Sequence, residues 1–310
     1  MHTILGINGA VGAHLAEILT QQNIKVRGVS RRDHPGNWEH VKADVLDAAS
    51  VLKATEGSEV VYLLVGLPYE IKVWRRDWPV AMQNTIDACL AHNAKLVFLD
   101  NVYALGLVDG PMKEDTPQHP ISEKGIVRAR IVDMLLDAMQ NKGLRGTIAR
   151  SADFYGPNTD KSVLNSTLFE RHVLGKSAFV MGKADKIHTY TFTLDIAPAL
   201  AILGTDARAD GQIWNIPTSQ EPWTGKDWVV ASASAFGVKP AFQATPTFML
   251  RILGLFTPFY RELVEMNYQY THPYVLLSEK FERTFGLKPT PYATGLAATV
   301  AYYKAKSTSK

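Results

Sequence analysis

The sequence predicts an α/β fold, a doubly wound parallel sheet that carries a smaller region in its C-terminal half. Strand-like and helix-like segments alternate over about the first 150 residues. The strand segments are apolar throughout, which is typical of a sheet covered on both faces. A glycine-rich turn also joins the first strand to the first helix, as in sheets of this class.

Successive segments follow this alternation. We expect strands at residues 3–7, 24–29, 60–65, 96–99 and 147–149, and an amphipathic helix at 126–139. Later we expect helices at 163–174, 225–236 and 247–270 and strands at 189–194 and 212–216. Residues 1–150, with contributions from about 188–216, are predicted to form a nucleotide-binding domain of the Rossmann type. Residues 151–310 are predicted to form mainly a substrate-binding region, with a pocket between the two parts.

Composition narrows the class of protein. Apolar residues make up 46% and charged residues 20% of the 310 residues, which predicts a globular chain with a large core. The single cysteine, Cys89, excludes an internal disulfide framework and a thiolate zinc cage, and no spacing suggests a metal site. A net charge of +3 with mixed signs argues against nucleic-acid binding. No apolar stretch reaches the roughly 20 residues of a membrane span, so we expect no membrane partner and a cytoplasmic protein.

The glycine turn has the features of a pyrophosphate-binding loop. Close approach to a phosphate needs glycine, and the amides at the start of the next helix bind negative charge. A glycine-rich turn without a ligand is the alternative, but strand, turn, helix and second strand occur here in the expected order. The predicted loop comprises Gly6, Asn8, Gly9, Ala10, Val11 and Gly12.

The end of the second strand suggests which cofactor binds. A site for NAD usually has a carboxylate there for the ribose 2′-hydroxyl. Ser30 takes that position and is followed by Arg31 and Arg32, whose guanidinium groups can bind a 2′-phosphate. We therefore expect NADP(H) to be favoured over NAD(H). The alternative is that both arginines are solvated loop charges and that Asp33 holds the ribose.

Several motifs occur together, in order, along nearly the whole chain. They are GINGAVG, the ADVLD turn, VVYLLVG, LVFLDNVYALG, EDTP, ARSADFYGP, TYTFTLDIAPAL and IWNIP. With them the chain resembles the extended short-chain dehydrogenase/reductase group, the NAD(P)-dependent epimerase/dehydratase-like proteins. The resemblance implies that Asp44 and Val45 contact adenine, that Val65 and Gly66 lie under the cofactor ribose, and that Tyr155 borders the nicotinamide. For Asp44, an ordinary turn aspartate is the alternative.

The catalytic residues of that family, a Ser or Thr and a Y-x-x-x-K pair, are replaced. Lys124 stands at the tyrosine position, Arg128 at the lysine position and Asn101 at the serine position. Arg128 can donate to ribose hydroxyls but cannot act as a base. Lys124 can act as a base if its pKa is lowered by about three units, or can polarise a carbonyl as an ammonium. Asn101 can donate a hydrogen bond to the same oxygen. Alternatively, Lys124 and Arg128 are solvated charges on an exposed helix face.

Other residues can supply a phenol or contact substrate. Tyr103 lies in a loop that the resemblance places beside the substrate, although packing over the cofactor is an alternative role. Asp153 replaces the Asn of the R-x-x-N element, and His188 opens a strand in a region that often touches substrate. A structural role is the alternative for His188. Trp78 belongs either to an aromatic wall of the site or to the core.

The function expected from these residues is hydride transfer between a nicotinamide cofactor and a small carbonyl or hydroxyl compound or a nucleotide sugar. The protein would be an oxidoreductase or epimerase/dehydratase-like enzyme with a non-standard acid or base. The alternative is a non-catalytic NADP(H)-binding redox sensor, because the usual triad is missing. The resemblance also suggests a homodimer through helices near 80–92 and 126–140.

Overall fold

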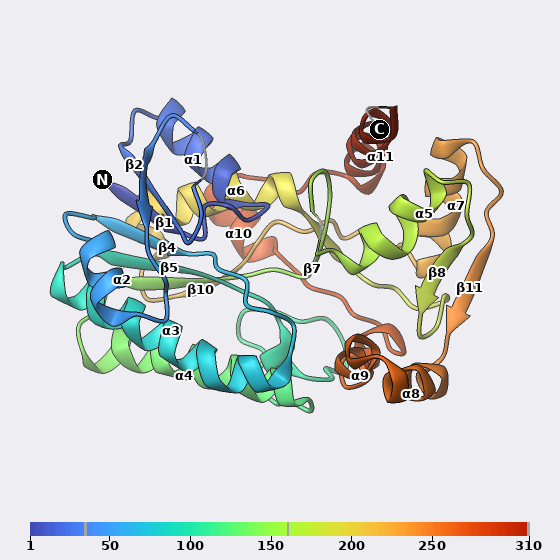
Figure 1. Ribbon diagram of the computed structural model, residues 1–310, viewed down its shortest axis with the longest axis horizontal. Helices are drawn as coiled ribbons and strands as arrows, with labels where there is room; N and C mark the ends of the chain where they lie inside the picture. Colours follow the sequence, from blue (N-terminus) through green and yellow to red (C-terminus); the bar gives the residue numbers. More distant parts are fainter. Residues whose placement is uncertain (34–35, 160, 309–310) are drawn as a thin grey trace.

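A seven-stranded parallel sheet forms the centre of the protein, in the strand order β10-β6-β5-β4-β1-β2-β3 (Figure 1). The structure, a computed structural model, describes residues 1–33, 36–159 and 161–308. The order confirms the predicted doubly wound topology. The strands are β1 (His2–Leu5), β2 (Val26–Ser30), β3 (Glu39–Lys42), β4 (Val60–Leu63), β5 (Lys95–Asp100), β6 (Gly146–Arg150) and β10 (Ile213–Asn215).

Helices cover both faces of this sheet and bury a separate apolar core on each. On one face α2 (Ala48–Ala54), α3 (Ile71–Ala91) and α4 (Glu123–Asn141) pack against the strands. On the other face lie α1 (Gly12–Gln21), α6 (Thr193–Thr205) and α10 (Glu279–Phe285). Burial on both sides explains why the strands carry continuous apolar runs.

The C-terminal half adds a third core beside the sheet. Two small parallel ladders pair β7 (Asp153–Tyr155) with β9 (Tyr190–Phe192), and β8 (Ala178–Met181) with β11 (Phe242–Thr245). The expected helix at 163–174 begins as a π-type turn, Asn165–Phe169, and continues as α5 (Glu170–His172). The helices α7 (Gly225–Phe236) and α11 (Tyr292–Thr308) complete this part.

One long helix expected at 247–270 is instead a helical hairpin. α8 (Thr247–Phe256) ends before Thr257, which is extended at φ −134° and ψ 116°, and α9 (Pro258–Val264) follows. Proline disfavours helical geometry in the residue before it, so the break falls at Thr257. A short 3-10 turn, Asn267–Tyr270, comes next. The hairpin, orange in Figure 1, lies at the lower right, below β8 and β11.

The candidate site lies at the carboxyl ends of the parallel strands. Open α/β sheets bind ligands at this edge. The turn after β1, the end of β2 and the 3-10 turn Tyr103–Leu105 after β5 all lie there. Among the described residues, no helix is both long and apolar enough to cross a membrane.

A buried histidine at the start of β1 predicts acid sensitivity. His2 is 6% exposed, its Nδ1 lies 3.1 Å from the hydroxyl of Tyr62, and burial lowers its pKa from 6.5 to about 4. The unfolded chain therefore takes up a proton that the folded chain does not between these values, so stability falls as the pH drops through this range. We expect this residue to account for about 2 kcal/mol of the stability lost between about pH 7.5 and about pH 5. Urea unfolding at both pH values should show a smaller loss in His2→Gln, and an unchanged loss would contradict this assignment.

Candidate functional site

The turn between β1 and α1 is shaped to let a ligand reach the backbone. Gly6 has φ +103°, and a Cβ there would lie 2.9 Å from the amide nitrogen of Val65. A Cβ at Gly12 would lie 2.7 Å from the carbonyl oxygen of Gly6. Gly9 is exposed at the tip of the turn. These glycines therefore keep strand, turn and helix closer together than any other residue would allow.

The first turn of α1 leaves its amide groups available. No side chain caps this helix, and no acidic residue lies in its first turn. Asn8 and Ala10 are exposed, whereas Val11 is buried in the core under α1. The Nδ2 of Asn8 donates to the carbonyl oxygen of Arg32 at 3.4 Å, which joins this turn to the end of β2. A free helix N-terminus beside a glycine cradle suits a pyrophosphate, so the residues present fit a dinucleotide.

The end of β2 presents positive charge to this turn. Arg31 and Arg32 are exposed, and no hydrogen bond or ion pair of their guanidinium groups occurs among the described residues. The Asp33 carboxylate binds the ammonium of Lys42 at 2.8 Å, which lowers the pKa of this exposed carboxyl. Ser30 Oγ contacts His40 Nε2 at 2.9 Å and donates to the carbonyl oxygen of Arg32.

Other predicted cofactor contacts lie along the same edge. Asp44 accepts a hydrogen bond from the amide of Leu46 at 3.0 Å, so its carboxylate shapes the turn after β3. The carbonyl oxygen of Val45 accepts one from Asn84 at 2.9 Å. Val65 is half-buried, and Gly66 is exposed after β4.

Lys161, which the sequence analysis did not select, lies beside Gly66. A Cβ on Gly66 would be 3.7 Å from its Nζ. No local sequence pattern marks this lysine, because it reaches the edge of the sheet from a distant loop.

The side chain of Tyr155 points away from the glycine turn, into the third core. It is completely buried among aromatic rings, with Trp228 at 4.9 Å and Phe192 at 5.2 Å between ring centroids. A Cβ on Gly295 would lie 2.1 Å from its hydroxyl, so α11 approaches the ring closely. In this arrangement Tyr155 can offer a cofactor its backbone but not its phenol.

Lys124 lies buried under α9. Its side chain is completely buried, and its Nζ forms ion pairs with Glu262 and, at 2.8 Å, with Glu265. The carbonyl oxygen of Glu262 also accepts from Nζ at 3.2 Å, and the ring centroid of Tyr69 lies 4.6 Å away. In this arrangement Lys124 does not face solvent, and its Nζ is held by two carboxylates.

The two glutamates also bind the starts of two helices. Glu262 accepts a hydrogen bond from the amide of Ile71 at 3.1 Å, at the beginning of α3. Glu265 accepts one from the amide of Glu123 at 2.7 Å, at the beginning of α4. Carboxylates are favourable partners for helix N-termini. Lys124 therefore holds α9 against α3 and α4, and we name this set of contacts the Lys124 clasp.

Arg128 is engaged in a second buried ion pair. Its Nε donates to Asp100 Oδ1 at 2.7 Å, and its Nη2 donates to the same carboxylate. Its guanidinium carbon lies 4.6 Å from the centroid of the Trp78 ring, and Trp78 is only 3% exposed within the core below α3. Since Lys124 and Arg128 are both buried, they are not solvated charges on an exposed helix face.

Tyr103, after β5, and Tyr69, just before α3, form a pair of phenols. Asn101 Oδ1 accepts a hydrogen bond from the amide of Tyr103 at 3.0 Å, which fixes the turn. The Tyr103 ring stacks on Trp74 at a centroid distance of 6.3 Å. Its hydroxyl hydrogen-bonds that of Tyr69, and burial raises the pKa of both phenols above the usual range. Tyr103 therefore stays protonated near neutral pH and is a weak acid there, which can donate to a strongly basic oxygen such as an alkoxide.

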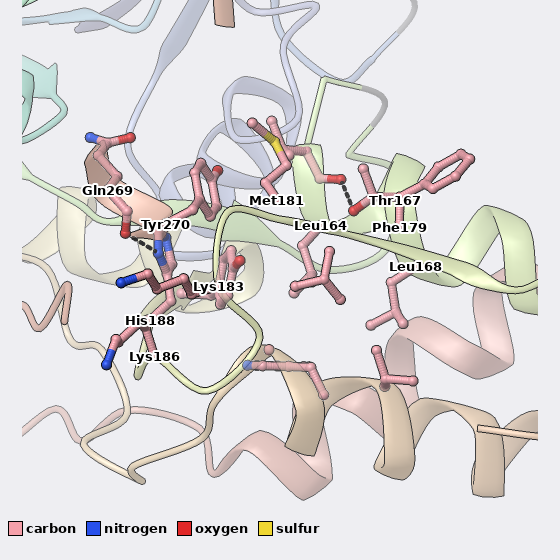
Figure 2. A pocket seen from close by; sticks show the side chains of 16 residues that line it. Leu164, Thr167, Leu168, Phe179, Met181, Lys183, Lys186, His188, Gln269 and Tyr270 are labelled. Carbon is pink, nitrogen blue, oxygen red and sulfur yellow. Dashed lines mark hydrogen bonds between the residues drawn. The ribbon is translucent and has the colours of Figure 1, made fainter. Parts of the chain in front are cut away.

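His188 lines a hollow of the C-terminal half (Figure 2), and it also contacts Asp153. His188 Nε2 lies 3.1 Å from Asp153 Oδ2, and Tyr270 donates to the same oxygen at 2.9 Å. His188 Nδ1 lies 3.1 Å from the carbonyl oxygen of Gln269 and must donate to it, because a carbonyl only accepts.

Tyrosines surround this pair. The His188 ring stacks on Tyr270 and Tyr274, with centroids at 4.7 and 4.5 Å. Burial raises the pKa of both phenols, and the nearby Asp153 charge raises it further. The adjoining hollow has about 480 Å³ of space, part of it open to solvent. Lys183 and Lys186 line it together with apolar side chains, as Figure 2 shows.

The described residues hold no group of three or more His, Cys, Asp or Glu side chains arranged to bind a metal ion.

Comparison with known proteins identifies the family. Residues 2–217 match the NAD dependent epimerase/dehydratase family. The match spans more than half of the chain, so the chain belongs to this family, and the resemblance found in the sequence is confirmed.

Curated relatives are distant and longer. A 3beta-hydroxysteroid-dehydrogenase/decarboxylase (isoform 2) of Arabidopsis thaliana is 24% identical over 258 residues, covering 77% of this chain and 44% of that protein. An uncharacterized UDP-glucose epimerase of Bacillus subtilis (strain 168), YtcB, is 22% identical over 214 residues, covering 66% of this chain and 65% of that protein. The chain thus spans about half to two thirds of the length of these relatives.

Solved structures share the fold over the whole chain. A UDP-glucose 4-epimerase of Thermotoga maritima with UDP-glucose has a TM-score of 0.81 at 18% identity, covering 99% of both chains. A UDP-glucuronic acid 4-epimerase of Bacillus cereus, in complex with UDP-glucuronic acid and NAD, also has a TM-score of 0.81 at 18% identity, covering 99% of this chain and 100% of that one.

The Lys124 clasp predicts a specific loss of stability. Lys124→Met leaves two partly buried carboxylates without their cation, so we expect the free energy of unfolding to fall by about 3 kcal/mol. Amide hydrogen exchange in α9 should also become faster. The control is Lys142→Met at the far end of α4, where an exposed pair with Asp137 at 3.0 Å is lost. That control should cost less than about 1 kcal/mol, and equal losses in both variants would refute the clasp.

Proposed function

We propose that this chain is a nicotinamide-dependent oxidoreductase that reduces or oxidises a small carbonyl or hydroxyl compound, with Tyr103 as the group that handles the oxygen proton. The observation that carries this proposal is the position of Tyr103 in the turn after β5, at the same carboxyl edge of the sheet as the glycine turn, with the charge of Asp153 acting on its hydroxyl. A nucleotide sugar is the second substrate class, since the solved neighbours named above bind UDP-sugars.

Several residues support cofactor binding in this proposal. The amides of the turn from Gly6 to Gly12 and the start of α1 hold the pyrophosphate, and Asp44 and Val45 contact the adenine. Val65 and Gly66 lie under the ribose, and Lys161 adds a positive charge beside them. When bound, the nicotinamide supplies or accepts the hydride.

Tyr103, rather than Lys124, suits the proton transfer. As a carbonyl carbon receives the hydride, its oxygen takes the Tyr103 proton and becomes a hydroxyl, and Tyr103 regains a proton from solvent, either directly or through the Tyr69 hydroxyl. Lys124 is held in its clasp by two carboxylates. Arg128 is held by Asp100, so neither replaces its family counterpart.

Tyr103→Phe tests the proton donor. With a substrate found by screening carbonyl compounds and UDP-sugars, we expect kcat to fall at least about 100-fold while KM changes little. Tyr69→Phe, which keeps the Tyr103 hydroxyl, is the matched control and should lose much less. A Tyr103→Phe rate within about twofold of wild type would exclude this residue as the donor.

The end of β2 supports a preference for NADP(H). Arg31 and Arg32 are free to bind a 2′-phosphate, while the Asp33 carboxylate is bound to Lys42. The solved neighbour from Bacillus cereus binds NAD, so this preference rests on the local charges alone.

Calorimetric titration with NADPH, NADP, NADH and NAD tests the preference. We expect Arg31→Ser/Arg32→Ser to weaken NADP binding at least about tenfold and to leave NAD binding nearly unchanged, since a charged phosphate contact contributes about 1.5–3 kcal/mol. A tenfold preference of the wild type for NAD would overturn the proposal.

A redox sensor that binds NADP(H) without turnover remains the second candidate. Its supporting observation is that both residues at the Y-x-x-x-K positions are engaged in buried ion pairs. Tight NADP(H) binding with no turnover in the substrate screen, and equal behaviour of wild type and Tyr103→Phe, would favour this function.

A further inference from the structure

The helix α8 is apolar on two opposite sides. On its inner side Leu250 is 2% exposed and packs with Met181 and Leu263. Large apolar side chains also point outward. They are Phe248 at 63%, Met249 at 41%, Ile252 at 53%, Leu255 at 81% and Phe256 at 81% exposure.

These outward side chains form one continuous face. Positions 248, 252, 255 and 256 follow the spacing of neighbours on one side of a helix. We name Phe248, Met249, Ile252, Leu255 and Phe256 the outer face of α8. Large apolar side chains gathered on an exposed surface mark an interaction site.

The negative and positive side chains of the hairpin face different sides. The charged residues of positions 247–264 are Arg251, Arg261 and Glu262. Glu262 turns inward to Lys124 in the clasp. Arg251 and Arg261 are exposed, and Arg251 lies one turn before Leu255, at the edge of the outer face. The solvent-facing charge of the hairpin is therefore positive.

We propose that the outer face of α8 docks onto an anionic lipid surface. An apolar face with Arg251 at its edge, on a hairpin whose solvent-facing charges are positive, fits the helices that lie in the interfacial plane of an anionic bilayer. A second copy of this chain fits less well, because its hairpin would bring the same positive charges to the contact and no exposed carboxylate to pair with them. The ten residues of α8 are too few to span a bilayer. This proposal departs from the expectation, drawn from the sequence, that the chain has no membrane partner.

The Lys124 clasp fixes how the molecule would be oriented on the lipid surface. Glu262 and Glu265 tie α9, and through it the hairpin, to the starts of α3 and α4. A lipid surface against α8 would therefore lie on the side of the molecule where α9 meets the starts of α3 and α4. The proposal does not depend on turnover or on a bound cofactor.

Sedimentation with vesicles tests the proposal on the full chain. The probes are vesicles of phosphatidylcholine alone and vesicles that also contain phosphatidylglycerol. We expect wild type to bind the anionic vesicles more tightly and to lose this preference in Arg251→Glu/Arg261→Glu. Leu255→Asp/Phe256→Asp should reduce binding at least about tenfold. Each substitution removes the favourable free energy of transferring an apolar side chain from water into the lipid.

The matched control is Leu174→Asp, which alters another exposed leucine, 63% exposed, outside the hairpin. It should bind vesicles as wild type does. Far-UV circular dichroism and sedimentation velocity accompany each variant. Wild type that does not bind anionic vesicles, or equal losses in the control, overturns the proposal. So does a wild-type dimer that becomes monomeric in Leu255→Asp/Phe256→Asp without any vesicle binding, because the outer face would then be a contact between copies.

Discussion

The buried ammonium of Lys124 is the interaction on which the arrangement of the site depends. It neutralises two carboxylates that also accept the first amides of α3 and α4. Three helices from distant parts of the chain thus meet at a single positive charge. Buried charges are stable only when they are paired and hydrogen-bonded, so the position of α9 against α3 and α4 depends on one side chain.

Local patterns predicted the scaffold well. The apolar strands, the glycine turn and the amphipathic helices are set by neighbouring residues, and the seven-stranded sheet contains strands at or near all the positions expected from the sequence in the first 150 residues. The prediction of a single helix at 247–270 was wrong, because Thr257 and Pro258 divide this segment into the two helices of a hairpin. The short strands β8 and β11 were missed, since four residues give little periodicity.

The site was harder to predict because its contacts are long-range. Lys124 and its partner Glu262 are 138 residues apart, and His188 and Asp153 are 35 apart. The resemblance predicted that Lys124 and Arg128 stand at the family's Y-x-x-x-K positions, but it gave no indication of which carboxylates bind them. Trp78 and Tyr155 are aromatic residues near the expected motifs, and the structure buries both side chains in the apolar cores. Lys161 carried no signal at all, because its relation to Gly66 exists only in the folded chain.

The clasp also constrains how this chain can change. Restoring a tyrosine at position 124 would not by itself recreate the usual catalytic pair, because Glu262 and Glu265 would lose their counter-charge and Arg128 would still be bound to Asp100. Positions 124, 262 and 265 are therefore energetically coupled, as are positions 100 and 128, and single exchanges within each set pass through destabilised intermediates. An engineer, or a lineage, seeking the ordinary chemistry of the family here would have to exchange these residues as a group.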